Sequence, residues 1–253
     1  MKKKIFIILI FLTFSQAEIS AISFNNLKEN LKNFFDKKIL NYIENILGTE
    51  DLSLENQEYI NDIIKNKLNI QKPIKLKRIN NFLTANPGIF HNAFATVNFL
   101  TNSDYIFFSE DFFNSLTDEE KQYLIAHEAT HVEKNHIKIK ISFFLASNFL
   151  TSYLIYKLGK NSKIPYNVGL SCSILLAITN LLLNKYLSRK CEYQADSVAV
   201  LKLKNSEGGI KLIKRWQELF KPQENCIKEL FLTHPDNENR IKNMQNLKKE
   251  FNK

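Results

Sequence analysis

Cysteine is scarce in this chain of 253 residues, which contains only Cys172, Cys191 and Cys226. Three cysteines cannot form a closed disulfide framework, and at most one bridge could form between them. None of their spacings is that of a zinc-binding cysteine pair. The cysteines therefore indicate neither a disulfide scaffold nor a cysteine-ligated zinc site.

The sequence also lacks a dense basic cluster interleaved with aromatic residues, although its net charge is +9 at pH 7. Nucleic-acid-binding proteins usually carry such a cluster, so we expect no nucleic-acid partner. The scattered lysines suit a solvated surface or an anionic membrane surface. Hydrophobic and charged contents of 44% and 24% are typical of a folded protein with one sizeable domain.

Residues 1–17 have the organisation of a secretory signal peptide. Lys2, Lys3 and Lys4 precede an apolar run at 5–14, and small residues surround a possible cleavage point after Ala17. The run is short for a membrane span, and an uncleaved anchor is the alternative. In either case we expect an exported protein, in the periplasm or another extracytoplasmic compartment.

Hydrophobic spacing predicts a mainly helical α+β fold. Apolar residues three and four apart are typical of amphipathic helices, whereas strict alternation after Pro73 is typical of strands. The strands should form a small sheet that is antiparallel in part. Helices are expected at 22–47, 54–68, 210–220 and 236–251, strands at 74–79, 93–99 and 105–109, a turn at 85–88, and a helix break at 206–209.

One long helix is predicted from Asp118 to about Lys140, because this stretch contains neither glycine nor proline. Thr117 and Glu120 form a capping-box pattern at its start. This helix follows directly after the predicted sheet. Any motif in its middle therefore has the geometry of a helix face.

The middle of that helix carries a His-Glu-x-x-His motif, formed by His127, Glu128 and His131. Residues four apart share one helix face, so the two imidazoles can bind one zinc ion. Glu128 lies beside them, where it could act as a base on a zinc-activated water. A zinc-stabilised structural protein is an alternative, but a structural site needs no such base.

Two histidines leave a catalytic zinc site one protein ligand short. In metzincins the third ligand is a histidine preceded by a glycine, but here Ile137 and Lys134 occupy those positions. Glu192 could complete the ligand set, and Asp196, one helical turn later, could accept a hydrogen bond from an imidazole. On their own, these two acidic residues fit an exposed helix face equally well.

Four sequence blocks together resemble the gluzincin family of the CaaX prenyl endopeptidase and the HtpX-type membrane proteases. The resemblance covers residues 72–245 and implies a zincin-like metallopeptidase domain. It implies one zinc ion per chain, bound by His127, His131 and Glu192, with Glu128 as general base. Ala129 and Thr130 replace the Leu and Gly common in the family, which are small changes. The blocks are Asn92–Ala95, Ala126–His136, Ser188–Asp196 and Thr233–Ile241.

The last block adds two further candidates. The resemblance implies that His234 and Arg240 stabilise the transition state, and a cationic Arg suits developing negative charge. A surface arginine and a histidine near a helix start are the alternative reading. We expect His136 to be packed or hydrogen-bonded near the site rather than to bind the metal.

Two uncharged stretches, 141–156 and 164–184, lie between the second histidine and Glu192. The second is long enough to span a bilayer, and the first is marginal. The resemblance favours a membrane hairpin, and a buried or interfacial hairpin is the alternative. We therefore expect a signal at 1–17, a helical segment at 18–71, and a metallopeptidase domain at 72–253 with a hydrophobic insert at 141–184.

The sequence thus predicts a zinc endopeptidase that cleaves protein or peptide substrates in envelope or membrane-protein quality control. The strand at 105–109 could pair with an extended substrate backbone. The alternative function is a chaperone or assembly factor for envelope proteins, with a restrained zinc site. Intact ligands alone do not distinguish the two.

Overall fold

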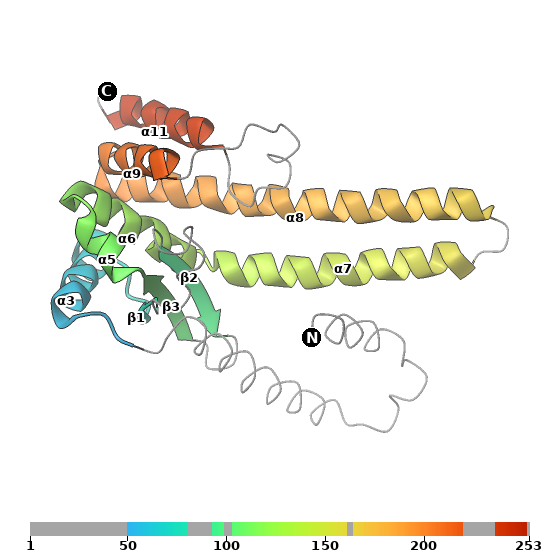
Figure 1. Cartoon of the computed structure of the whole chain (residues 1–253), viewed down its shortest axis with the longest axis horizontal. Helices are drawn as coiled ribbons and strands as arrows, with labels where there is room; N and C mark the ends of the chain where they lie inside the picture. The colour runs from blue at the N-terminus through green and yellow to red at the C-terminus, as the bar shows by residue number, and fades with distance from the viewer. Residues whose placement is uncertain (1–49, 80–92, 99–102, 161–163, 220–235, 252–253) are drawn as a thin grey trace, which may run out of the picture. The chain divides into compact units, whose positions relative to one another are not determined.

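A computed structural model describes residues 50–79, 93–98, 103–160, 164–219 and 236–251 of the chain (Figure 1). They belong to one compact unit, Glu44–Lys253. The expected signal at 1–17, the helix at 22–47, the turn at 85–88 and His234 lie outside the described residues.

The first described helix is α3, Leu54–Asp62, which continues into a single π-helical segment, η2, Ile63–Lys67. The helix predicted at 54–68 is therefore confirmed. Ile60, Ile63 and Ile64 are buried, as their spacing predicts, whereas Leu54 is 73% exposed. The buried apolar face of this helix therefore does not include Leu54, where the predicted helix begins.

A three-stranded mixed sheet follows, formed by β1 (Ile74–Arg78), β2 (Ala93–Asn98) and β3 (Ser103–Phe108). The strand order is β1-β3-β2, with β3 parallel to β1 and antiparallel to β2. The predicted sheet is confirmed. Pairing of a substrate with β3 is wrong, because β3 is the central strand and both of its edges are already occupied.

The short helix α5 (Glu110–Ser115) leads into α6 (Asp118–Glu133), which carries the predicted capping box. The backbone N–H of Thr117 donates to the Glu120 carboxylate at 2.8 Å. The helix does not continue to 140 as predicted. It ends at Glu133 because Asn135 adopts a left-handed conformation with φ 55°, which asparagine tolerates better than most residues.

The predicted insert is a helical hairpin, formed by α7 (His136–Lys160) and the first half of α8 (Tyr166–Leu203). Figure 1 shows the two helices lying alongside each other, and they are in contact. Asn180 donates to the side chain of Asn148 and Asn184 to that of Ser147, both at 3.2 Å. Most apolar side chains of the hairpin are exposed, and each helix is long and apolar enough to cross a membrane.

Helices α9 (Glu207–Leu219) and α11 (Asn237–Phe251) complete the fold. Helix α9 packs against α6, α11 packs against α8, and the two helices pack against each other. The predicted break is at Lys204, which has φ 51°. Gly208 instead lies inside α9. A Cβ atom on Gly208 would stand 2.1 Å from the carbonyl oxygen of Glu119, so this glycine permits close contact between α9 and α6.

One hydrophobic core joins α3, η2, the sheet, α6, α8, α9 and α11. Because α3 and η2 share this core with the later elements, a boundary at 71/72 does not separate two cores. The core fixes α6 and α8 against each other, and these two helices carry the predicted ligands. Its fully buried members include Ile60, Ile106, Phe108, Phe113, Leu124, Leu212 and Met244.

Candidate metal centre

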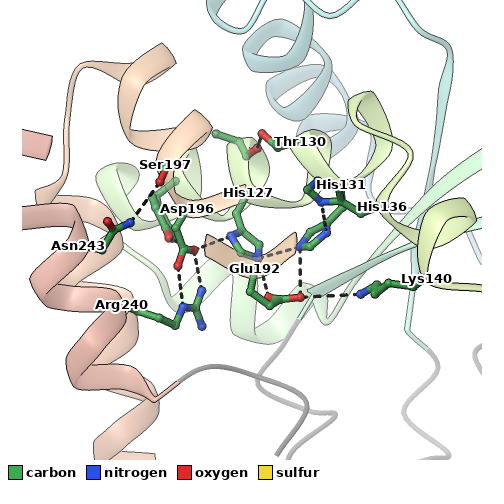
Figure 2. Close-up of polar contacts among 12 residues, drawn as sticks. His127, Thr130, His131, His136, Lys140, Glu192, Asp196, Ser197, Arg240 and Asn243 are labelled. Carbon is green, nitrogen blue, oxygen red and sulfur yellow. Dashed lines mark hydrogen bonds and ion pairs between the residues drawn. The ribbon is translucent and has the colours of Figure 1, made fainter. Parts of the chain in front are cut away.

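Three predicted ligands meet where α6 packs against α8 (Figure 2). His127 Nε2 lies 3.2 Å from His131 Nε2 and 3.4 Å from Glu192 Oε2, and His131 Nε2 lies 3.6 Å from Glu192 Oε1. Ligands bound to zinc at 2.0–2.1 Å in a tetrahedron stand roughly 3.3–3.4 Å apart. The donor set and its spacing therefore fit a zinc ion.

His127 is held from its other side by Asp196. Nδ1 of His127 lies 2.9 Å from Oδ1 of Asp196, which is fully buried. A carboxylate in this position favours the proton on Nδ1 and directs Nε2 toward the metal position. The structure thus places Asp196 where the sequence predicted an imidazole partner.

Asp196 is itself held by two buried side chains. Arg240, on α11, donates to its carboxylate from Nε at 2.8 Å and from Nη2 at 2.7 Å. The hydroxyl of Tyr123, on α6, donates to the same carboxylate at 2.6 Å. Arg240 therefore connects to the candidate ligand His127 through Asp196, and its predicted role at the transition state stays a prediction. Sequence reasoning did not identify Tyr123.

His131 has a different partner. Its Nδ1 lies 2.9 Å from Nδ1 of His136, and Nε2 of His136 lies 3.1 Å from Oε1 of Gln194. His136 was expected to be packed or hydrogen-bonded near the site, and the structure places it there. Gln194 was not predicted, because its contact depends on how the start of α7 packs against α8.

Burial and neighbouring charges shift the pKa values of His127 and His131 in opposite directions. Burial alone would lower the pKa of His127, but hydrogen bonds to Asp196 and Glu192 outweigh it and raise the pKa to about 10. Burial lowers the pKa of His131 to about 4. His131 is thus neutral at pH 7, whereas a metal ion must displace a proton from His127 to bind there.

Two charged groups flank the ligands. Glu128 is buried on α6, and its charge contributes to the raised pKa of His127. Lys140, near the start of α7, lies 3.9 Å from Oε1 of Glu192. The site therefore combines a candidate metal-binding triad with an adjacent carboxylate that could exchange protons with a substrate.

Comparison with known proteins identifies the family. The model of peptidase family M48 matches residues 55–248. The chain belongs to peptidase family M48. This assignment confirms the gluzincin resemblance, and the matched region contains all three candidate ligands together with Glu128, Asp196 and Arg240.

Relatives within the M48 family include bacterial HtpX proteins. The chain is 29% identical over 177 residues to a protease HtpX homolog of Helicobacter acinonychis, covering 60% of this chain and 56% of that protein. It is 24% identical over 185 residues to protease HtpX of Actinobacillus pleuropneumoniae serotype 5b, covering 62% of each. The chain thus covers 56% of the length of the first relative and 62% of the length of the second.

A solved structure shares the M48 fold seen here. The crystal structure of S. mikatae Ste24p superposes with a TM-score of 0.60 at 18% identity, over 86% of this chain and 56% of that one. At this identity the likeness concerns the fold alone. It confirms a mainly helical architecture with a small mixed sheet.

Proposed function

We propose that this M48 protein is a zinc-dependent endopeptidase. The observation that carries the proposal is the convergence of His127, His131 and Glu192 beside Glu128. When bound, a zinc ion supplies Lewis-acid activation of water and of a peptide carbonyl. A site that served only to stabilise the fold would not need a buried carboxylate next to its ligands.

Each side chain has a defined task in this proposal. His127, His131 and Glu192 hold the metal, and Asp196 keeps the proton of His127 on Nδ1. Glu128 takes a proton from the attacking water and returns it to the departing amine. His234 is proposed, from the resemblance, to stabilise the developing negative charge.

The substrate backbone is proposed to pair with β2. Within the described residues, β2 pairs with β3 on one side and contacts α7 and also α6, which carries two of the candidate ligands. An extended peptide could add to its other edge through main-chain hydrogen bonds. N-methylation of single peptide bonds in a cleaved peptide should raise KM at alternating positions, and an equal effect at every position would contradict strand pairing.

The hairpin is proposed to anchor the enzyme in a membrane of the cell envelope, with a signal at 1–17 directing export. Its exposed apolar side chains support this, because a soluble hairpin would leave a large apolar surface in water. Fractionation of cells that produce one of two deletion variants distinguishes the role of the hairpin from that of residues 1–17. Deletion of 141–184 should release the protein to the soluble fraction, whereas deletion of 1–17 should abolish export.

The test of the enzyme is Glu128→Gln in the full-length protein. We expect unchanged zinc content, measured by atomic absorption, and a loss of unfolded-protein cleavage of about 10²-fold or more. Cleavage equal to wild type would contradict the proposal. The rival chaperone function predicts that both forms suppress aggregation of an unfolded protein equally without cleaving it.

A further inference from the structure

The two histidine ligands are oriented by different outer groups. His127 faces the carboxylate of Asp196, whereas His131 faces the neutral ring of His136, which contacts Gln194 (Figure 2 shows His131 and His136). We propose that His136 and Gln194 are positioning residues that keep the proton of His131 on Nδ1 and leave Nε2 open to the metal. This inference rests on the proposed zinc site.

The contact with Gln194 determines where the protons lie on His136 and His131. The side-chain oxygen of Gln194 can only accept, so Nε2 of His136 must carry a proton to donate to it. A neutral His136 then has an unprotonated Nδ1, which can only accept. The 2.9 Å contact between the two Nδ1 atoms therefore requires the proton to sit on His131. Nε2 of His131 is consequently unprotonated, as a metal ligand must be.

The opposite arrangement would disable the site. If Nδ1 of His136 carried the proton, Nδ1 of His131 would have to accept it, and Nε2 of His131 would be protonated. A protonated ring nitrogen cannot bind a metal. The Gln194 oxygen therefore selects the tautomer of a ligand that it does not touch.

The turn between α6 and α7 holds His136 in place. His136 is the first residue of α7 and only 1% exposed, and it follows directly after Asn135 with its left-handed backbone. Lys72 donates to the carbonyl of Val132 and to the side chain of Asn135, both at 3.1 Å. The early end of α6 thus brings a third histidine back against the second ligand.

The first experiment compares His136→Asn with His136→Leu in the full-length protein. Asparagine places a side-chain oxygen close to the position of Nδ1, whereas leucine has a similar size and no acceptor. Competition with a chromogenic chelator should give a zinc dissociation constant 10–100-fold higher for His136→Leu and within about threefold of wild type for His136→Asn. Equal constants for the two variants would overturn the proposal.

A matched control variant tests whether the zinc dissociation constant responds to any change in packing near the site. Thr130 is buried next to His131 and donates only to the Ala126 carbonyl of its own helix, at 2.7 Å. Thr130→Val should therefore leave the zinc dissociation constant unchanged. A loss as large as that of His136→Leu would show that the constant reports general packing and would also overturn the proposal.

A second pair of variants changes a residue outside the core, so it tests the proposal even if His136→Leu fails to fold. Gln194 is exposed, and Gln194→Glu keeps an acceptor that Gln194→Leu removes. We expect a several-fold weaker zinc affinity for Gln194→Leu only, because water can replace part of the contact. Ring ¹⁵N NMR of histidine-labelled, zinc-free protein should show the His131 proton on Nδ1 in wild type and a mixture of tautomers in Gln194→Leu. A single unchanged tautomer in both proteins would contradict the inference, whereas failure of wild type to bind zinc would contradict the proposed function instead.

Discussion

The guanidinium of Arg240 donates two hydrogen bonds, of 2.8 and 2.7 Å, to the carboxylate of Asp196. Arg240 is only 3% exposed and Asp196 is 0% exposed. The contact joins α11 to α8 across 44 residues of sequence. Because the same carboxylate contacts His127, we expect the arginine to stabilise both the fold and the orientation of this candidate ligand.

Arg240→Leu should lower the free energy of unfolding by about 3–5 kcal/mol, because it leaves the Asp196 charge buried without its partner. Zinc affinity should fall as well. Arg240→Lys keeps the charge but cannot form the two-pronged contact, so we expect an intermediate loss. Denaturant unfolding and chelator competition measure both effects. A variant with wild-type stability and zinc affinity but reduced kcat would instead favour a role at the transition state.

Tyr123→Phe removes the third hydrogen bond to this cluster while leaving the ring in the core. We expect a loss of about 1–2 kcal/mol in unfolding free energy, because a buried carboxylate loses a donor. Tyr59→Phe is the matched control, since the hydroxyl of Tyr59 bonds Asp118 at an exposed position. Similar losses in the two variants would contradict a special role for the Asp196 cluster.

The N-terminus of α6 should make stability depend on pH. Burial alone would raise the pKa of Glu120, but hydrogen bonds from Arg215 and Thr117 outweigh it and lower the pKa below 4.5. The ionised carboxylate therefore stabilises the fold above about pH 4.5, and this contribution disappears as the pH falls through the lower pKa of the folded state. Glu120→Gln should cost about 1 kcal/mol at pH 7, since Arg215 is partly exposed.

Thermal unfolding between pH 7 and pH 3 checks this expectation, and Glu120→Gln should lose less stability on acidification than wild type. Glu207→Gln is the control, because Glu207 pairs with Lys248 at the surface. If the stability of Glu120→Gln decreased on acidification as steeply as that of wild type, Glu120 would not be the source of the pH dependence.

Gly208→Ala should damage the contact between α9 and α6. Its new Cβ would stand 2.1 Å from a backbone oxygen of Glu119, which cannot move away as a flexible side chain would. We expect a loss of about 1–3 kcal/mol, measured by denaturant unfolding. Gly159→Ala, on α7 with no atom within 4 Å of the new Cβ, should be neutral or slightly stabilising. A neutral Gly208→Ala would mean that α9 can shift without cost.

Local patterns in the sequence predicted most of the elements and the two candidate histidine ligands, whereas Glu192 was implied by the family resemblance. Apolar periodicity located α3 and α11, alternation located β1, and four-residue spacing placed His127 beside His131. Each of these signals lies within a few residues of chain, so one sequence carries it completely.

The remaining features depend on contacts that local patterns do not encode. The end of α6 at Glu133 depends on the backbone of Asn135, which is held from a distant segment by Lys72. The central place of β3 depends on its pairing with β1 across 30 residues. The contact of Gln194 with His136 likewise exists only once α7 and α8 are packed together.

Helix α8 is continuous over 38 residues, so it is roughly 57 Å long at 1.5 Å per residue. Glu192 lies eight residues beyond Asn184, the last residue of the apolar stretch, and no break separates them. The core fixes the part of α8 beyond the apolar stretch against α6. A bilayer around the apolar stretch would therefore hold the candidate metal centre at a set height, roughly 12 Å along the helix from Asn184.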